Sequence, residues 1–154
     1  MKLRSLALVG LAAVLTLGFA PAASAAPVDE MQSRIDKVLE DFPGGVQISP
    51  NEVAWDDGAT VLTLEDSTAV SAFSVGSCPA GSFCAYSYAG YVGSRLTFTS
   101  CTASNSVAPL GTVRSIANSR ASGTVRGYNG TTVTVSVAAN TGVNTTAAIT
   151  RLGC

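Results

Sequence analysis

The sequence predicts a mainly β protein, a β-sandwich preceded by an amphipathic helix and a short hairpin. Short strand-forming runs alternate with turns rich in Gly, Asn and Ser. Asn129-Gly130 lies between alternating apolar residues, which is a strong hairpin signal. Ser and Thr supply 22 of the residues from 78 to 154, so hydroxyl groups rather than charges solvate that part. Hydrophobic residues make up 47% of the chain, which is enough to bury a core.

Residues 1–25 have the pattern of a signal peptide. Lys2 and Arg4 form a basic region, an apolar run covers residues 6–19, and residues 23–25 supply small side chains for cleavage. The apolar run is shorter than the roughly 20 residues that span a bilayer. We expect cleavage after Ala25, secretion of the remaining chain, and no stable membrane insertion afterwards. An uncleaved membrane anchor is the alternative.

Charge divides the rest of the chain into two unlike parts. Residues 26–77 contain ten acidic and two basic residues, a net charge of −8, whereas residues 78–154 contain five arginines and no acidic residue. The sequence thus predicts an acidic N-terminal extension at 26–77 and a disulfide-stabilised β-sandwich domain at 78–154, with opposite charges that favour contact. One continuous domain with segregated charges is the alternative. The total charge of −1 predicts no nucleic-acid binding.

The acidic part begins with apolar residues at helical spacing. They predict an amphipathic helix from residue 28 to 42, which Pro43 and the following glycines end. Short strands are expected at 46–48, 52–55 and 60–64, and the turn Asp56-Asp57-Gly58 would join the last two into a hairpin. The two aspartates are typical of turn chemistry rather than of a metal or acid/base site. The charges and the helix stripe suggest that residues 28–64 dock on the arginine-bearing part and shield a functional face, as a pro-segment does. The alternative is a permanently integrated subdomain, which the core-like hairpin around Trp55 favours.

The second part has the pattern of an antiparallel β fold. Strand-forming runs bounded by turn residues predict strands at 83–88, 95–100, 113–117, 124–128, 132–137 and 147–152.

Four cysteines predict two disulfide bonds. Cys78, Cys84, Cys101 and Cys154 are an even number in a chain expected to be exported, which favours disulfides over a metal site or a reactive thiol. Three pairings are possible. We favour Cys78 with Cys84, because the five intervening residues suit a tight loop, and Cys101 with Cys154 by elimination. The long loop is worth about 4 kcal/mol and the short one about 2 kcal/mol on the chain-entropy model.

Several enzyme classes are excluded by composition. The chain contains no histidine, which removes His-dependent triads, His-ligated zinc and imidazole general bases. It also contains no Gly-x-Ser-x-Gly elbow, and its cysteines are expected in disulfides. We therefore expect a protein that is not an enzyme and needs no cofactor.

One stretch resembles a known family. Residues 78–86 carry a Cys-Pro-x-Gly-x-x-Cys-x-Tyr pattern, residues 91–93 read Tyr-Val-Gly, and Cys101 follows. With residues 115–118, this pattern resembles the secreted peptidase inhibitor family 36, the actinobacterial metalloproteinase inhibitors. The resemblance covers about 40 residues and implies a βγ-crystallin-like Greek-key fold.

The resemblance also implies roles for four residues of the fold. Tyr86 and Tyr91 would form the aromatic corner of a folded hairpin, and Gly93 would adopt a positive φ that other residues resist. Ser115 would tie the hairpin down. These residues would define the fold rather than contact a partner.

Two departures from the family pattern limit the resemblance. The second motif, around residues 128–144, is degenerate: its Tyr-x-Gly, at residues 128–130, coincides with the hairpin turn, so a symmetric pair of Greek-key motifs is not expected. The stretch aligned with crystallin calcium sites is 110–115; it contains no carboxylate and places Arg114 where a ligand would be. We expect no bound calcium there, because hard cations need several oxygen ligands.

The resemblance implies a secreted inhibitor of metalloproteinases that blocks the protease cleft with a rigid loop. The candidate loops are 102–111, which contains Pro109 and Leu110, and 78–84. Both are also ordinary strand connections. The alternative function is a secreted cell-surface binding or toxin-like βγ-crystallin-type module, whose five arginines form a cationic face for an anionic polymer. The expected partner is a secreted protease, and the oligomeric state is not predicted.

Overall fold

The computed structural model describes residues 27–65 and 77–154. One helix, α1 (Pro27–Asp41), precedes short strands. The strands described are β1 (Val46–Ser49), β2 (Glu52–Trp55), β3 (Thr60–Thr63), β4 (Phe83–Tyr88), β5 (Val92–Phe98), β6 (Asn105–Ser106), β7 (Ser115–Asn118), β8 (Val125–Asn129), β9 (Thr132–Val137), β10 (Thr141–Asn144) and β11 (Arg151–Gly153). The predicted signal peptide lies outside the described residues.

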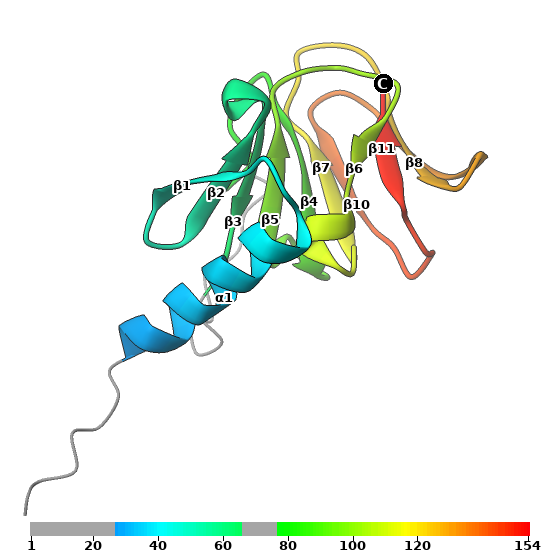
Figure 1. Ribbon diagram of the computed structural model, residues 1–154. Helices are drawn as coiled ribbons and strands as arrows, with labels where there is room; N and C mark the ends of the chain where they lie inside the picture. The colour runs from blue at the N-terminus through cyan, green and yellow to red at the C-terminus, as the bar shows by residue number, and fades with distance from the viewer. Residues whose placement is uncertain (1–26, 66–76) are drawn as a thin grey trace, which may run out of the picture.

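The strands form two antiparallel sheets, so the protein is mainly β as expected. The larger sheet has the order β1-β2-β3-β5-β4-β7-β10, and the smaller has the order β6-β11-β8-β9. Figure 1 shows α1 beside the β1–β3 end of the larger sheet, with β8 and β11 of the smaller sheet on the other side of the molecule. The helix therefore lies beside the β1–β3 end of the larger sheet, and its C-terminal end also approaches β6 of the smaller sheet.

The acidic and the arginine-bearing parts contribute strands to one sheet. β3 pairs with β5 in antiparallel register, with Leu62 opposite Leu96. β5 in turn pairs with β4, which pairs with β7. The change of charge between residues 77 and 78 therefore separates two stretches of sequence that share a continuous hydrogen-bonded sheet.

A row of apolar side chains crosses the larger sheet and forms the centre of the core. Successive register partners contribute Val53, Leu62, Leu96, Ala85 and Ile116, all fully buried. The same core includes Ile35 of α1 and Leu152 of β11. Burying one such side chain stabilises the fold by about 1.5–3 kcal/mol. The helix and both sheets therefore share one hydrophobic core.

The end of α1 and the chain that follows are set by local backbone chemistry. The amide of Phe42 still donates to the carbonyl of Val38 at 2.9 Å, but Pro43 cannot donate and cannot continue the helix. Gly44 then adopts φ +88°, which reverses the chain toward β1. This reversal brings the indole of Trp55 to the helix end, where Nε1 donates to the carbonyl of Phe42 at 3.1 Å.

The strands differ from the sequence prediction at four places. β6 and β10 were not predicted. The strand expected at 147–152 is only β11, although Ile149 is still buried in the core. β5 begins at Val92 rather than at residue 95, because the chain turns tightly after Tyr88. β6 and β10 form through pairing with β11 and β7, partners that lie far away in the sequence.

Candidate functional site

The chain between β5 and β7 forms the long loop that the sequence singled out. Cys101, near its start, is bonded to Cys154, and the two Cα atoms are 5.7 Å apart. Cys78 is bonded to Cys84, with a Cα separation of 5.8 Å. These are the two pairs that the loop argument favours. The Cys101–Cys154 bond closes the loop against the strand β11 that precedes Cys154.

Asn105 anchors the middle of the loop. Its Nδ2 donates to the carbonyls of Thr102, at 3.2 Å, and Leu152, at 3.3 Å, while its Oδ1 accepts from the Thr102 hydroxyl at 2.9 Å. The side chain is buried, and β6 pairs with β11 at the same point. Buried, fully paired amide groups fix a single loop conformation, because any alternative leaves polar groups unpaired.

The two halves of the loop differ in exposure. Residues 100–104 are all exposed. Val107 is buried, and its amide donates to the carbonyl of Thr150 at 3.4 Å. Leu110 packs against the hydrophobic core, and Pro109 is partly buried. The continuous exposed surface of the loop therefore covers residues 100–104, and Ser106 and Ala108 are single exposed positions beyond it.

A groove of about 780 Å³ lies beside this loop. Its walls come from three segments that are distant in sequence: the end of α1 at 41–43, the β2–β3 turn region at 55–60, and the loop at 100–109. A backbone hydrogen bond of 3.0 Å from the amide of Thr99 to the carbonyl of Ala59 joins two of these walls. The groove therefore depends on the contact between the acidic part and the loop.

Two carboxylates line the groove, Asp41 and Asp56. Asp41 forms an ion pair with Lys37 at 3.0 Å on the exposed face of α1. The hydrogen bond to Asp41, and then its charge, raise the pKa of Lys37 above its ordinary value. Asp56 and Asp57 both have positive φ angles of 53°, a conformation that Asp tolerates better than most residues. The positive φ angles therefore explain why aspartates occupy both positions of this turn.

Tyr86 and Tyr91 lie against one another, as the aromatic-corner hypothesis requires. Their ring centroids are 5.9 Å apart, and the ring planes meet at 78°. The hydroxyl of Tyr86 shares a hydrogen bond of 2.8 Å with that of Ser77. Burial raises the pKa of Tyr86, and the contacts with Ser77 and Arg95 partly offset this effect. Tyr86 is thus a neutral, buried hydrogen-bonding group.

Ser115 and Gly93 hold the same hairpin in shape. The Ser115 hydroxyl accepts from the amide of Tyr91 at 3.0 Å and donates to the carbonyl of Tyr88 at 2.7 Å. Gly93 has φ +80°, and a Cβ there would lie only 2.4 Å from Ser87 Oγ. A side chain at position 93 would be both strained and in collision.

The two cysteines of the 78–84 loop lie against the sheet, and residues 79–81 between them are exposed. Cys78 and Cys84 are 4% and 0% exposed, and they form a second apolar cluster with Tyr86 and Ala117. The amide of Gly81 donates to the carbonyl of Ser119 at 2.9 Å. This loop braces the face of β4 and β7 opposite the main core.

The stretch aligned with crystallin calcium sites presents an exposed arginine side chain. Arg114 is exposed, and its carbonyl accepts from the amide of Thr145 at 2.9 Å. Within residues 27–65 and 77–154, no three His, Cys, Asp or Glu side chains gather as metal ligands. Over the same residues, the structure contains no helix with the length and apolar character needed to cross a membrane.

Three features of the site were not anticipated from the sequence: the anchoring side chain of Asn105, the groove, and a contact between Arg120 and the Cys101 sulfur. Arg120 Nη1 lies 3.0 Å from Cys101 Sγ. The sequence offered one weak indication of these two residues: Asn105 and Arg120 are polar and lie near the ends of expected strands. Which groups they meet is decided by strands from other parts of the chain.

The fold and this loop define a class of protein: a small, disulfide-bonded, two-sheet β protein that presents a braced loop beside a groove. Residues 71–140 match the family model of peptidase inhibitor family I36, and this match confirms the resemblance found in the sequence. It indicates a peptidase inhibitor. The matched segment contains the exposed loop and three of the four cysteines, and it ends before β10 and β11. Neither the curated proteins nor the solved structures yielded a match to the chain.

Proposed function

We propose that this protein is a secreted inhibitor of metalloproteinases that fills the protease cleft with residues 100–104. The observation that carries the proposal is the combination of an exposed stretch with two anchors. The Cys101–Cys154 bond holds the stretch near its start, and the hydrogen-bonded Asn105 holds it directly after its end. A loop ordered before binding does not spend ordering entropy on association, so its affinity is higher.

Pro109 and Leu110 act in this proposal as the base of the loop. Leu110 packs on the core, and the carbonyl of Ala108 accepts the amide of Gly111 at 3.0 Å. This short turn directs the chain toward β7 and fixes the C-terminal part of the loop on the core. The 78–84 loop is not proposed as a contact, because its cysteines are buried against the sheet and its exposed part is limited to residues 79–81.

The resemblance supplies the rest of the proposal. Residues 1–25 direct export, and the described chain adopts the βγ-crystallin-like Greek-key arrangement. The Tyr86–Tyr91 contact, the positive φ of Gly93 and the bonds of Ser115 support that assignment. Metalloproteinases are the proposed targets because the matching family pattern is that of metalloproteinase inhibitors.

The test is a titration of purified secreted metalloproteases, including a thermolysin-like enzyme, and serine proteases with the oxidised protein. We expect stoichiometric loss of metalloprotease activity alone. Ser104→Arg should raise the inhibition constant at least tenfold, because a large side chain then stands on the exposed stretch. Ser136→Arg is the matched control, an exposed serine on β9, and should inhibit like the parent. Failure to inhibit any protease of the panel would contradict the proposal.

A second candidate function is favoured by one surface. Arg151 lies opposite Tyr128 in the β11–β8 register, and its guanidinium carbon is 3.7 Å from the tyrosine ring centroid. Arg126 is exposed two residues before Tyr128 on β8, and residues 78–154 contain no acidic residue. Such a face suits an anionic cell-wall polymer. Salt-sensitive retention on purified cell walls, lost in Arg126→Ser, would support this function.

A further inference from the structure

The two disulfide bonds have opposite surroundings. Cys78 and Cys84 are buried at 4% and 0% exposure within the second apolar cluster. Cys101 and Cys154 are both exposed. The second bond therefore joins two residues at the surface, whereas the first is covered.

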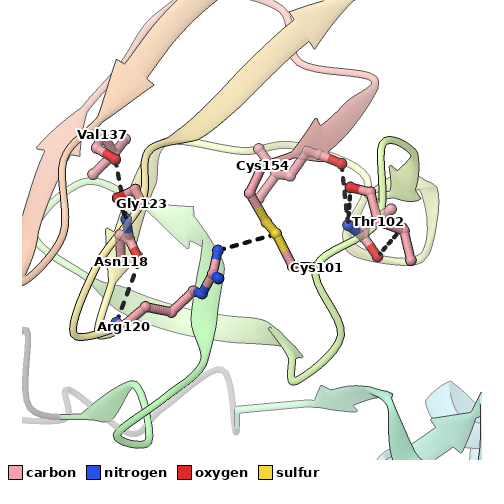
Figure 2. Close-up of a disulfide and its surroundings, with 9 residues drawn as sticks. Cys101, Thr102, Asn118, Arg120, Gly123, Val137 and Cys154 are labelled. Atoms are coloured by element: carbon pink, nitrogen blue, oxygen red, sulfur yellow. Dashed lines mark hydrogen bonds between the residues drawn. A yellow bond between two sulfur atoms is a disulfide. The ribbon is translucent and has the colours of Figure 1, made fainter.

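A cation lies against one sulfur of the exposed bond. Arg120 Nη1 donates to Cys101 Sγ at 3.0 Å, and Figure 2 shows the guanidinium pointing at that sulfur. Within residues 27–65 and 77–154 this guanidinium forms no ion pair. No carboxylate of the described residues therefore neutralises the positive charge beside Cys101 Sγ. A positive charge beside a cysteine stabilises the thiolate form of that cysteine.

The turn that carries Arg120 is fixed by a buried side chain. Asn118 is fully buried, and its Nδ2 donates to the carbonyls of Gly123, at 3.2 Å, and Val137, at 3.1 Å. Its Oδ1 accepts from the backbone amide of Arg120 at 3.3 Å (Figure 2). Asn118 thus ties both ends of this turn to β9 and holds the backbone from which the guanidinium extends.

We propose that the Cys101–Cys154 bond is a site of thiol–disulfide exchange with low-molecular-weight thiols, in which Cys154 is attacked and Cys101 leaves. The thiolate of the small thiol forms a new S–S bond with Cys154 Sγ. The Cys101–Cys154 bond breaks, and its electron pair departs on Cys101 Sγ as a thiolate beside Arg120. The direction follows because the sulfur whose thiolate is better stabilised is the better leaving group.

A second molecule of thiol completes the reduction. It attacks the sulfur of the small-molecule half of the mixed disulfide and releases Cys154. Two small thiols are thereby oxidised to one disulfide, and the protein bond gains two electrons to give two cysteines. Asn105 still holds the loop by hydrogen bonds after this step, but the covalent closure of residues 100–104 is gone. If the proposed inhibitory function holds, exchange lowers inhibition through this loop.

The experiment measures exchange without any protease, so its outcome is independent of the proposed function. The oxidised chain is incubated with reduced glutathione at neutral pH, quenched in acid, alkylated and mapped by mass spectrometry. We expect glutathione on Cys154, alkylation on Cys101, and an intact Cys78–Cys84 bond, with the exposed bond opening at least tenfold faster. Adducts mainly on Cys101, or equal opening of both bonds, would overturn the proposal.

Variants then test the cation. Arg120→Ala should slow the opening of the exposed bond severalfold, and Arg120→Lys, which keeps the charge, should remain near the parent rate. Arg114→Ala, an exposed arginine directly before β7, is the matched control and should leave the rate unchanged. Unfolding would speed exchange, so a slower rate cannot come from a damaged fold. Equal rates in the parent and in Arg120→Ala would refute the role of Arg120.

Discussion

The ring of Tyr91 lies against Gly142. A Cβ built at Gly142 on β10 would stand 2.6 Å from Tyr91 Oη and Cε1. Tyr91 is also held from the other side, where its ring meets that of Tyr86 at a centroid distance of 5.9 Å. The aromatic corner therefore reaches across to the edge strand of the larger sheet, and a side chain at position 142 has no free space.

Gly142→Ala should lower the free energy of unfolding by about 1–3 kcal/mol, the usual cost of forcing a group into packed space. Chemical denaturation measures it. A double-mutant cycle with Tyr91→Ala supplies the control: once the ring is absent, the same substitution should cost little. An unchanged cost in the Tyr91→Ala background would show that the ring is not the cause.

Ser115→Ala should also destabilise the fold, by about 1–3 kcal/mol. The substitution leaves the amide of Tyr91 and the carbonyl of Tyr88 without the hydroxyl that pairs with both, in a buried position. Urea denaturation of this variant is compared with that of Ser136→Ala, which alters an exposed serine and should match the parent.

Alkaline pH should destabilise the protein through Tyr86. Its pKa in the folded protein is raised above the ordinary value of about 10, chiefly by burial. Above that pH the unfolded chain loses the proton first, so the free energy of unfolding falls as the pH rises past 10. Tyr86→Phe should reduce this fall, whereas Tyr88→Phe, at an exposed tyrosine, should keep it. Identical alkaline profiles for the two variants would argue against the assignment to Tyr86.

Cutting the chain between its acidic and arginine-bearing parts should not separate them. The pairing of β3 with β5 and the shared core hold residues 46–63 in place. A protease site introduced between residues 70 and 71 allows the cut, and we expect both fragments to elute together from gel filtration in moderate salt. Fragments that separate at once would show that the sheet does not hold the two parts together.

Calcium should leave the melting temperature unchanged. The aligned stretch 110–115 presents the cationic side chain of Arg114 and no carboxylate. A ligand that binds the folded state stabilises it by mass action, so a real site would raise the melting temperature at millimolar calcium. A calcium-dependent rise that EDTA reverses would contradict this prediction.

The strands that form from local signals were predictable from the sequence. The Asn129-Gly130 turn between β8 and β9 places Gly130 at φ +59°, as a tight hairpin requires. The alternation of Phe83 and Ala85 on one face of β4 with Cys84 and Tyr86 on the other matches the two apolar clusters. In both cases the pattern lies within a single run of residues.

The parts that depend on distant partners were not predictable. β10 contains Gly142 and Asn144, which are poor strand formers, and it exists because it pairs with β7. The groove combines segments around residues 42, 56 and 102, and no local pattern joins them. The candidate loop 102–111 lies within the longer segment between β5 and β7, which also contains β6, and the half-buried position of Leu110 follows from core packing that the sequence alone does not reveal.

The strand order of the larger sheet has a consequence for how the protein is made. β3 is hydrogen-bonded to β5, which lies after β4 in the chain, so residues 46–63 leave the ribosome well before their partner exists. Until residues 92–98 follow, β3 offers an open edge to other chains. Residues 26–77 have a net charge of −8, so copies of this segment repel one another before β5 is present.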